Sequence, residues 1–247
     1  MTNRPMHDPA NFARLQAIYA EGEAMIQERR FPEAAAKFSE GLAIDDQFRQ
    51  RYITMYSQRA FAYHNMGRHD LAEVDYAKAI AMEPPPYAAQ NHFQRAMCLR
   101  KLERDDEALD AFNQAIAIMP EQPGPRHLRG KLLVDREKYE EAIADFDAFL
   151  AGGNVNPEVF QLRALCNLCL KRAQAAIEDA SSAQRMQQDP YNDYIATCSL
   201  ALLGNVNAMV GAMQRTIQGE PAFKDSLRQA TEIDPYRGDP RVAALLA

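Results

Sequence analysis

Two cysteines, Cys166 and Cys169, come closest to a reactive motif in this sequence of 247 residues. A C-x-x-C pair can exchange disulfides or bind a metal ion where the thiolate form is stabilised. The sequence has no second pair at metal-like spacing, and this pair falls inside a predicted helix rather than at a helix N-terminus. We therefore expect cysteines that pack in a core, and keep thiol redox activity as the alternative.

Arginine recurs along the chain at Arg59, Arg95, Arg129 and Arg163. Such a ladder of guanidinium groups could bind the carboxylates or phosphates of a ligand. However, an aspartate follows three of these arginines by sixteen residues, at Asp75, Asp145 and Asp179. Internal ion pairs are the simpler interpretation, and open, unpaired guanidinium groups would favour a ligand site instead.

The remaining candidates for chemistry are few. The five histidines show no H-E-x-x-H motif or other spacing typical of metal ligands. Ser181 and Ser182 have no histidine near them in the sequence, and there is no glycine-rich phosphate loop. We therefore expect no catalytic residue, no metal and no cofactor, and a protein that is not an enzyme.

Composition narrows the possible partners. The formal net charge of -6 leaves no basic surplus to neutralise phosphates, so nucleic acid and anionic membranes are poor candidates. The N-terminal residues lack the apolar run of a signal peptide, which predicts a cytoplasmic protein. Residues 195–213 carry no charge, but Gly204 interrupts them, so we expect two buried helices joined by a turn rather than a membrane span.

Residues 89–120 show the pattern that must position these side chains. Ala108, Phe112 and Ala115 fall on one face of a predicted helix, where small residues let another helix approach and the ring fills the space beside them. Ala96 has the same role on the preceding helix, and Pro120 ends the unit. One helix pair cannot bury both its faces, so neighbouring pairs must stack on it.

The pattern returns about five to six times and resembles the tetratricopeptide repeat, a helix-turn-helix unit of about 34 residues. In-register positions include Gly22 with Phe38, Ala60 with Tyr76, Gly130 with Phe146, and Ala164 with Ala180. The resemblance implies an all-α fold, a right-handed α-solenoid of antiparallel helix pairs. We expect a flexible tail over residues 1–8, the repeat array over 9–220 and capping helices over 221–247, the first of them running from Pro221 to Ile233.

The resemblance also implies a concave groove lined by the first helix of each pair. Carried over by position, the groove residues would be Tyr19, Glu23, Gln58, Phe61, Asn65, Phe93, Gln94, Met97, Lys101, His127, Lys131 and Asp135. Aromatic rings beside amide groups suit a bound peptide, because rings supply contact area and amides pair with its backbone. Packing of Phe61 and Phe93 on neighbouring helices is an equally good interpretation.

These features predict a non-enzymatic module that binds a protein or peptide in its groove. A self-associating assembly scaffold and a chaperone-like adaptor are the alternatives. Members that bind the acidic tails of chaperones carry a carboxylate clamp of lysine, asparagine and arginine. This sequence has Tyr19, Glu23 and Gln58 at the first three clamp positions, so we do not expect that specificity.

Overall fold

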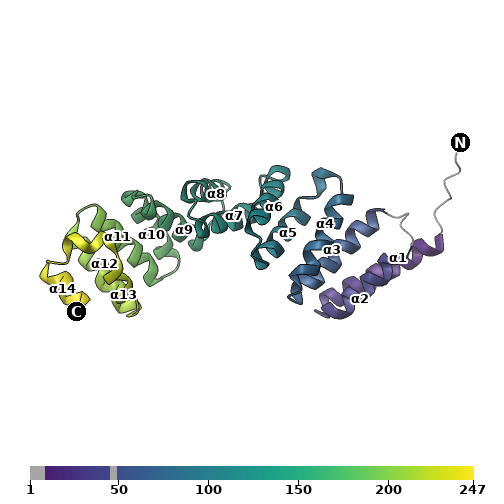
Figure 1. Ribbon diagram of the computed structural model, residues 1–247, viewed down its shortest axis with the longest axis horizontal. Coiled ribbons are helices and arrows are strands. Elements are labelled where there is room, and N and C mark those ends of the chain that lie inside the picture. The colour runs from purple at the N-terminus through teal and green to yellow at the C-terminus, as the bar shows by residue number, and fades with distance from the viewer. Residues whose placement is uncertain (1–8, 45–48) are drawn as a thin grey trace. The chain divides into compact units, whose positions relative to one another are not determined.

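The computed structural model describes residues 9–44 and 49–247, so the predicted tail of residues 1–8 lies outside the described residues. Within these ranges the chain is all-α, with helices, turns and no strand (Figure 1). The chain divides into two compact units, Met1–Pro125 and Arg126–Ala247. Each unit contains its own run of packed helices.

The first unit contains three antiparallel helix pairs. Its helices are α1 (Pro9–Gln27), α2 (Phe31–Leu42), α3 (Arg49–Asn65), α4 (His69–Met82), α5 (Ala89–Lys101) and α6 (Asp105–Ile118), with a short 3-10 helix, η1 (Pro85–Tyr87), before α5. Each helix packs against the next one along the chain. As Pro120 predicts, α6 ends two residues before it.

The second unit continues the same plan. It contains α8 (Tyr139–Ala151), α9 (Pro157–Cys169), α10 (Ala173–Met186), α11 (Pro190–Leu202) and α12 (Val206–Gly219), and most of α7 (Pro123–Asp135). Again, α8 to α12 pack each against the next. The pairs confirm the predicted helical-repeat fold, and α11 with α12 forms the sixth pair.

A small residue on the first helix of a pair meets a large one on the second. An added Cβ at Gly22 would lie 2.6 Å from the Phe38 ring, and one at Gly130 would lie 2.6 Å from the Phe146 ring. Ala60 belongs to one buried cluster with Tyr76, which is only 2% exposed. The rings therefore fill space that any larger residue on the facing helix would occupy.

The turn inside each pair has one repeated geometry. The second residue after the first helix adopts a left-handed conformation, with φ between 58° and 73°, at Arg29, Gly67, Glu103, Glu137, Lys171 and Gly204. The next amide donates to the carbonyl five residues earlier, as from Arg104 to Leu99 at 3.0 Å. This bond closes the helix end as a Schellman motif, which satisfies a carbonyl that the helix leaves unpaired.

The C-terminal residues differ in one respect from the prediction. Instead of one helix over 221–233, the chain forms α13 (Phe223–Gln229), a 3-10 helix η2 (Thr231–Tyr236) and then α14 (Pro240–Leu246). The break falls at Ala230, which is extended, and Pro235 keeps the segment after it from forming an α-helix, because it lacks an amide proton and its ring clashes with the preceding turn. The break lets both Leu227 and Ile233 become fully buried.

The uncharged residues 195–213 are divided between α11 and α12 at Gly204, as expected. Among the residues that the structure describes, no helix has both the length and the apolar character needed to cross a membrane.

Enlarging a small residue that is buried between packed helices should destabilise the fold. Ala96 in α5 is fully buried, so Ala96→Leu must displace its neighbours, and we expect it to cost about 1 to 3 kcal/mol of unfolding free energy. Ala117→Leu, at an exposed position of α6, is the matched control. Urea unfolding measures both, and equal midpoints for the two variants would contradict a tightly packed seam.

Candidate functional site

The recurring arginines are paired, as the sequence predicts. Arg59 binds both carboxylate oxygens of Asp75, at 2.6 and 2.9 Å, and Arg163 binds those of Asp179 at 2.8 and 2.6 Å. Arg129 and Asp145 form the same two-bond pair. The aspartates are almost completely buried. The arginines therefore hold the two helices of a pair together.

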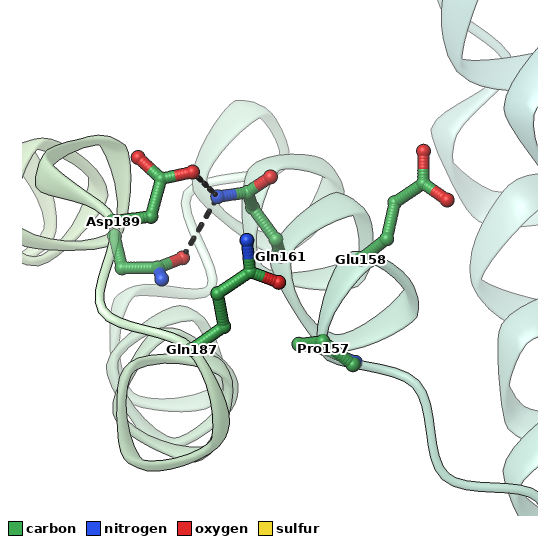
Figure 2. A pocket seen from close by; sticks show the side chains of 6 residues that line it. Pro157, Glu158, Gln161, Gln187 and Asp189 are labelled. Atoms are coloured by element: carbon green, nitrogen blue, oxygen red, sulfur yellow. Dashed lines mark hydrogen bonds between the residues drawn. The ribbon is translucent and has the colours of Figure 1, made fainter.

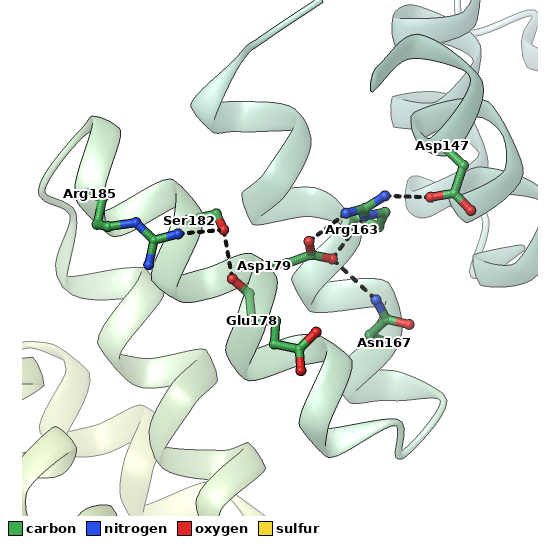
Figure 3. A network of polar contacts seen from close by, with 7 residues as sticks. All are labelled: Asp147, Arg163, Asn167, Glu178, Asp179, Ser182 and Arg185. Carbon is green, nitrogen blue, oxygen red and sulfur yellow. Dashed lines mark hydrogen bonds and ion pairs between the residues drawn. The ribbon is translucent and has the colours of Figure 1, made fainter. Parts of the chain in front are cut away.

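The same guanidinium groups also reach the preceding pair. Arg59 donates to the Ser39 hydroxyl on α2, and Arg163 donates to the Asp147 carboxylate on α8 (Figure 3). Arg95 lacks an aspartate sixteen residues later and binds Glu73 on α4 instead, at 2.7 and 2.9 Å. One planar cation thus links three helices at Arg59 and at Arg163.

In the first unit, Tyr19, Glu23 and Gln58 lie together. The Tyr19 hydroxyl donates to Glu23 Oε1 at 2.6 Å, and the Gln58 side chain hydrogen-bonds with the same hydroxyl. Burial, together with the neighbouring Glu23 carboxylate, raises the pKa of Tyr19 to about 12. The phenol therefore stays neutral and acts as a hydrogen-bonding group between α1 and α3.

The two predicted groove phenylalanines both contact a ring on a neighbouring helix and remain partly exposed. Phe61 is 37% exposed and meets the Phe31 ring edge-on at 6.3 Å. Phe93 lies against the Phe112 ring, with centroids 6.2 Å apart. Packing and partner contact are thus compatible at these positions, because each ring presents only part of its surface to its neighbour.

The other predicted groove residues of the first unit are polar or flexible. Asn65 is exposed and its amide donates to the Phe61 carbonyl at 2.8 Å. Gln94 and Met97 are partly buried on α5, and Lys101 is exposed at its last residue. Amide, thioether and ammonium groups are thus accessible around the phenylalanines.

In the second unit, His127 and Lys131 on α7 gather around Glu158 on α9. His127 Nε2 lies 3.2 Å from the Glu158 carboxylate, and the Lys131 ammonium forms an ion pair with the same carboxylate. Burial lowers the pKa of His127, although Glu158 opposes this shift. Burial alone would raise the pKa of Glu158, but Lys131 outweighs it and the pKa is lowered. Asp135 is exposed at the end of α7.

Beside Glu158 there is a pocket of about 250 Å³ lined by Pro157, Glu158, Gln161, Gln187, Asp189 and Asn192 (Figure 2). Gln161 donates to Asp189 at 3.0 Å and to Asn192 at 3.1 Å. Figure 2 shows the Glu158 carboxylate turned away from Gln161 and Asp189. The pocket is therefore a polar notch whose walls offer amide and carboxylate groups.

The sequence prediction missed this pocket. Gln161 follows His127 by 34 residues, one repeat length, so its place among the groove positions could have been read from the sequence. Gln187, Asp189 and Asn192 come from the connection between α10 and α11 and from the start of α11. No repeat pattern indicates those three residues.

The cysteines divide into three buried and one exposed. Cys98, Cys166 and Cys198 are buried, and burial raises the pKa of each to about 12. Cys169 is exposed at the last residue of α9. All four are free thiols. Cys166 therefore fills core space, as predicted, whereas Cys169 does not.

Comparison with known proteins agrees with this architecture. Two models of the tetratricopeptide repeat match residues 51–121 and 127–193, together more than half of the chain. A relative from Dictyostelium discoideum, "DnaJ homolog subfamily C member 7 homolog", is 29% identical over 111 residues, which cover 44% of this chain. The chain matches only 20% of the length of that relative.

Solved structures show the same fold at low sequence identity. The C-terminal part of a TPR repeat-containing protein from Cytophaga hutchinsonii has a TM-score of 0.70 at 14% identity, with 92% of each chain covered. YrrB, described as a TPR protein with an unusual peptide-binding site, has a TM-score of 0.58 at 17% identity over 69% of this chain and 88% of that chain. These similarities support the fold alone.

Each buried ion pair should contribute more to the unfolding free energy than the exposed ion pair that the same arginine makes. Asp179→Asn removes a buried carboxylate from Arg163, and we expect it to lower the unfolding free energy by about 1.5 to 3 kcal/mol. Asp147→Asn removes the exposed partner of the same arginine and should cost less than about 1 kcal/mol. Urea unfolding at neutral pH compares them, and a larger loss for Asp147→Asn would reverse this assignment.

The cysteines should differ sharply in reactivity. Each of the three buried thiols has a pKa of about 12, far above pH 8, so these thiols stay protonated at that pH. We therefore expect one fast-reacting thiol in the native protein, Cys169. The other three should react only after denaturation. Labelling with a thiol reagent measures this. Rapid native labelling of Cys166 together with Cys169 would instead favour thiol redox activity.

Proposed function

Because this chain belongs to the tetratricopeptide repeat family, we propose that it is a non-enzymatic interaction protein that holds a peptide or protein segment on the first helices of its pairs. Repeats of this family generally mediate protein-protein interaction. The observation that carries the proposal is a set of partly exposed aromatic, amide and thioether side chains on α3 and α5. It comprises Phe61, Phe93, Gln58, Asn65, Gln94 and Met97.

The chemistry of this set fits a peptide better than a small polar ligand. Phe61 and Phe93 are braced by neighbouring rings, so a partner can contact them without having to order them first. Braced aromatic residues are the usual anchors of protein interfaces. Amide groups beside them can pair with peptide backbone, and Lys101 adds a positive charge at the end of α5.

The second unit offers a different contact. Its polar pocket presents the Gln161 amide, the Asp189 carboxylate and, on another side, Glu158 with Lys131 and His127. These groups could hold a polar side chain or a turn of a partner. We place the main contact on the first unit, because the half-exposed rings supply the apolar area that the second-unit pocket lacks.

The features that would support an enzyme are weak. Burial keeps Cys98, Cys166 and Cys198 in the unreactive thiol form. Ser182 donates its hydroxyl to the Glu178 carbonyl and accepts from Arg185, so no base activates it (Figure 3). The arginines are occupied by carboxylates. Together these arrangements favour binding over catalysis.

The alternative, self-association through the C-terminal helices, has less exposed apolar surface to rest on. Leu227, Ile233 and Val242 are fully buried in one cluster with residues of α11 and α12. Leu245 and Leu246 pack against this cluster and stay partly exposed, so only part of the apolar surface that could meet a second copy is left. We do not pursue an assembly scaffold built on these helices.

Site-specific photo-crosslinking tests the proposal, because it shows which face of the protein contacts a captured partner. A photo-crosslinking residue in place of Met97 on α5 should form a covalent adduct with a captured protein or peptide. The same residue in place of Asp110, exposed on α6, should form none, because it lies on the second helix of the pair. Adducts at Asp110 alone would place the contact on the other face.

A matched pair of aromatic variants provides the affinity measurement. Phe61→Glu should weaken capture at least about tenfold, because it puts a charge where a partly desolvated ring is needed. Tyr87→Glu changes an aromatic residue that is 73% exposed in η1, outside the predicted set, and should leave capture unchanged. Thermal melting shows whether each variant is folded. Equal capture by both variants would contradict the proposed surface.

A further inference from the structure

Three side chains of the first unit converge where α3, α4 and α5 meet. His64 lies near the end of α3, His69 is the first residue of α4, and Cys98 lies on α5. His64 Nδ1 is 3.3 Å from Cys98 Sγ, and the two imidazole ring centroids are 4.9 Å apart. One donor atom from each residue lies within 4.8 Å of the other two.

We propose that His64, His69 and Cys98 form a binding site for a borderline-soft transition-metal ion, zinc in the first instance. Two imidazoles and one thiolate are donors that zinc prefers, and three protein ligands leave a fourth position for water or a partner side chain. The site joins two successive helix pairs. A bound ion would therefore fix the second and third pairs to each other.

The geometry is close to what such an ion requires. Zinc bonds of about 2.0 to 2.3 Å place the donor atoms of a tetrahedral site roughly 3.3 to 3.8 Å apart. The distance of 3.3 Å between His64 Nδ1 and Cys98 Sγ already falls within this range. No two of the three donor atoms are more than 4.8 Å apart, so each pair need close by at most about 1.0 to 1.5 Å, which is within the reach of side-chain rotation.

Both histidine rings are partly buried where the three helices meet. Burial, together with the nearby His69 and Lys101, lowers the pKa of His64. Nδ1 of His69 is buried and has no hydrogen-bond partner among the described residues. A buried polar atom without a partner is costly, so this ring lies in surroundings where a further bond would be stabilising.

The thiol is the group that the metal must deprotonate. Burial, with a smaller effect of the Glu73 carboxylate, raises the pKa of Cys98 to about 12. A zinc ion replaces that proton on binding, as it does at other cysteine ligands. Of the charged groups acting on these ligands, Lys101 opposes a cation and Glu73 favours it.

The packing of the fold does not demand these residues. Val134 and Leu168 occupy the place of His64 in later pairs, each three residues before the left-handed turn residue. Tyr139 and Ala173 occupy the place of His69, two residues after that turn residue. Other side chains thus serve at both positions in later pairs, so the two histidines beside a cysteine need another explanation.

The test uses the full chain, stripped of metal by a chelator and titrated with Co²⁺ as a coloured substitute for zinc. We expect one equivalent of Co²⁺ to bind, with a thiolate-to-cobalt charge-transfer absorption, and Zn²⁺ to displace it. His64→Gln, His69→Gln and Cys98→Ala should each weaken binding by at least about tenfold, since even residues that only support a ligand cost this much. Cys98→Ala should also abolish the charge-transfer band.

Cys166→Ala is the matched control. Cys166 is a buried thiol five residues before its left-handed turn residue, as Cys98 is, but Val134 and Tyr139 occupy the places that His64 and His69 have in the earlier pair. This variant should bind Co²⁺ as the parent protein does. Circular dichroism without metal shows that each variant is folded. The proposal is overturned if the parent chain binds no Co²⁺, if the band survives Cys98→Ala, or if His69→Gln binds normally.

Discussion

The contact on which this structure depends is an aromatic ring packed against a glycine or alanine of the facing helix. Phe38 and Phe146 lie so close to Gly22 and Gly130 that even a methyl group would have to displace the ring. This approach sets the distance between the two helices of a pair, and that distance brings the arginine of one helix to the carboxylate of the other. Where Ala180 replaces the ring, Arg163 and Asp179 still keep both bonds, so the polar contact supports the pair there.

The buried ion pairs give the stacked helices a fixed register. An apolar seam can slide at little cost, but a guanidinium group bound by two oxygens is satisfied in one geometry only. Arg95 shows that the requirement is for a buried carboxylate rather than for one sequence position, since Glu73 on the preceding pair takes the place of the missing aspartate. In the last pair the roles are reversed, with Arg215 on α12 bound to Asp193 on α11.

The repeating parts of the molecule could be predicted because they follow from spacing. Phe112 four residues after Ala108, and Asp75 sixteen after Arg59, each specify a face of a helix and thus a contact. The polar pocket around Gln161 and the cluster of His64, His69 and Cys98 could not be predicted in this way. Both arise where side chains from different pairs meet, and the residue spacing within one repeat does not predict contacts between repeats. The break at Ala230 escaped prediction because the apolar pattern continues across it.

The turns inside the pairs are alike in backbone conformation although their residues differ. Glu103, Glu137 and Lys171 accept a left-handed conformation that costs an ordinary residue about 1 kcal/mol or more, whereas Gly67 and Gly204 adopt it freely. A segment excised between two of these turns would leave ends that already share the same geometry and could be rejoined. The chain is therefore suited to growing or shrinking by whole pairs, as internal duplication would produce, with each copy free to acquire its own surface.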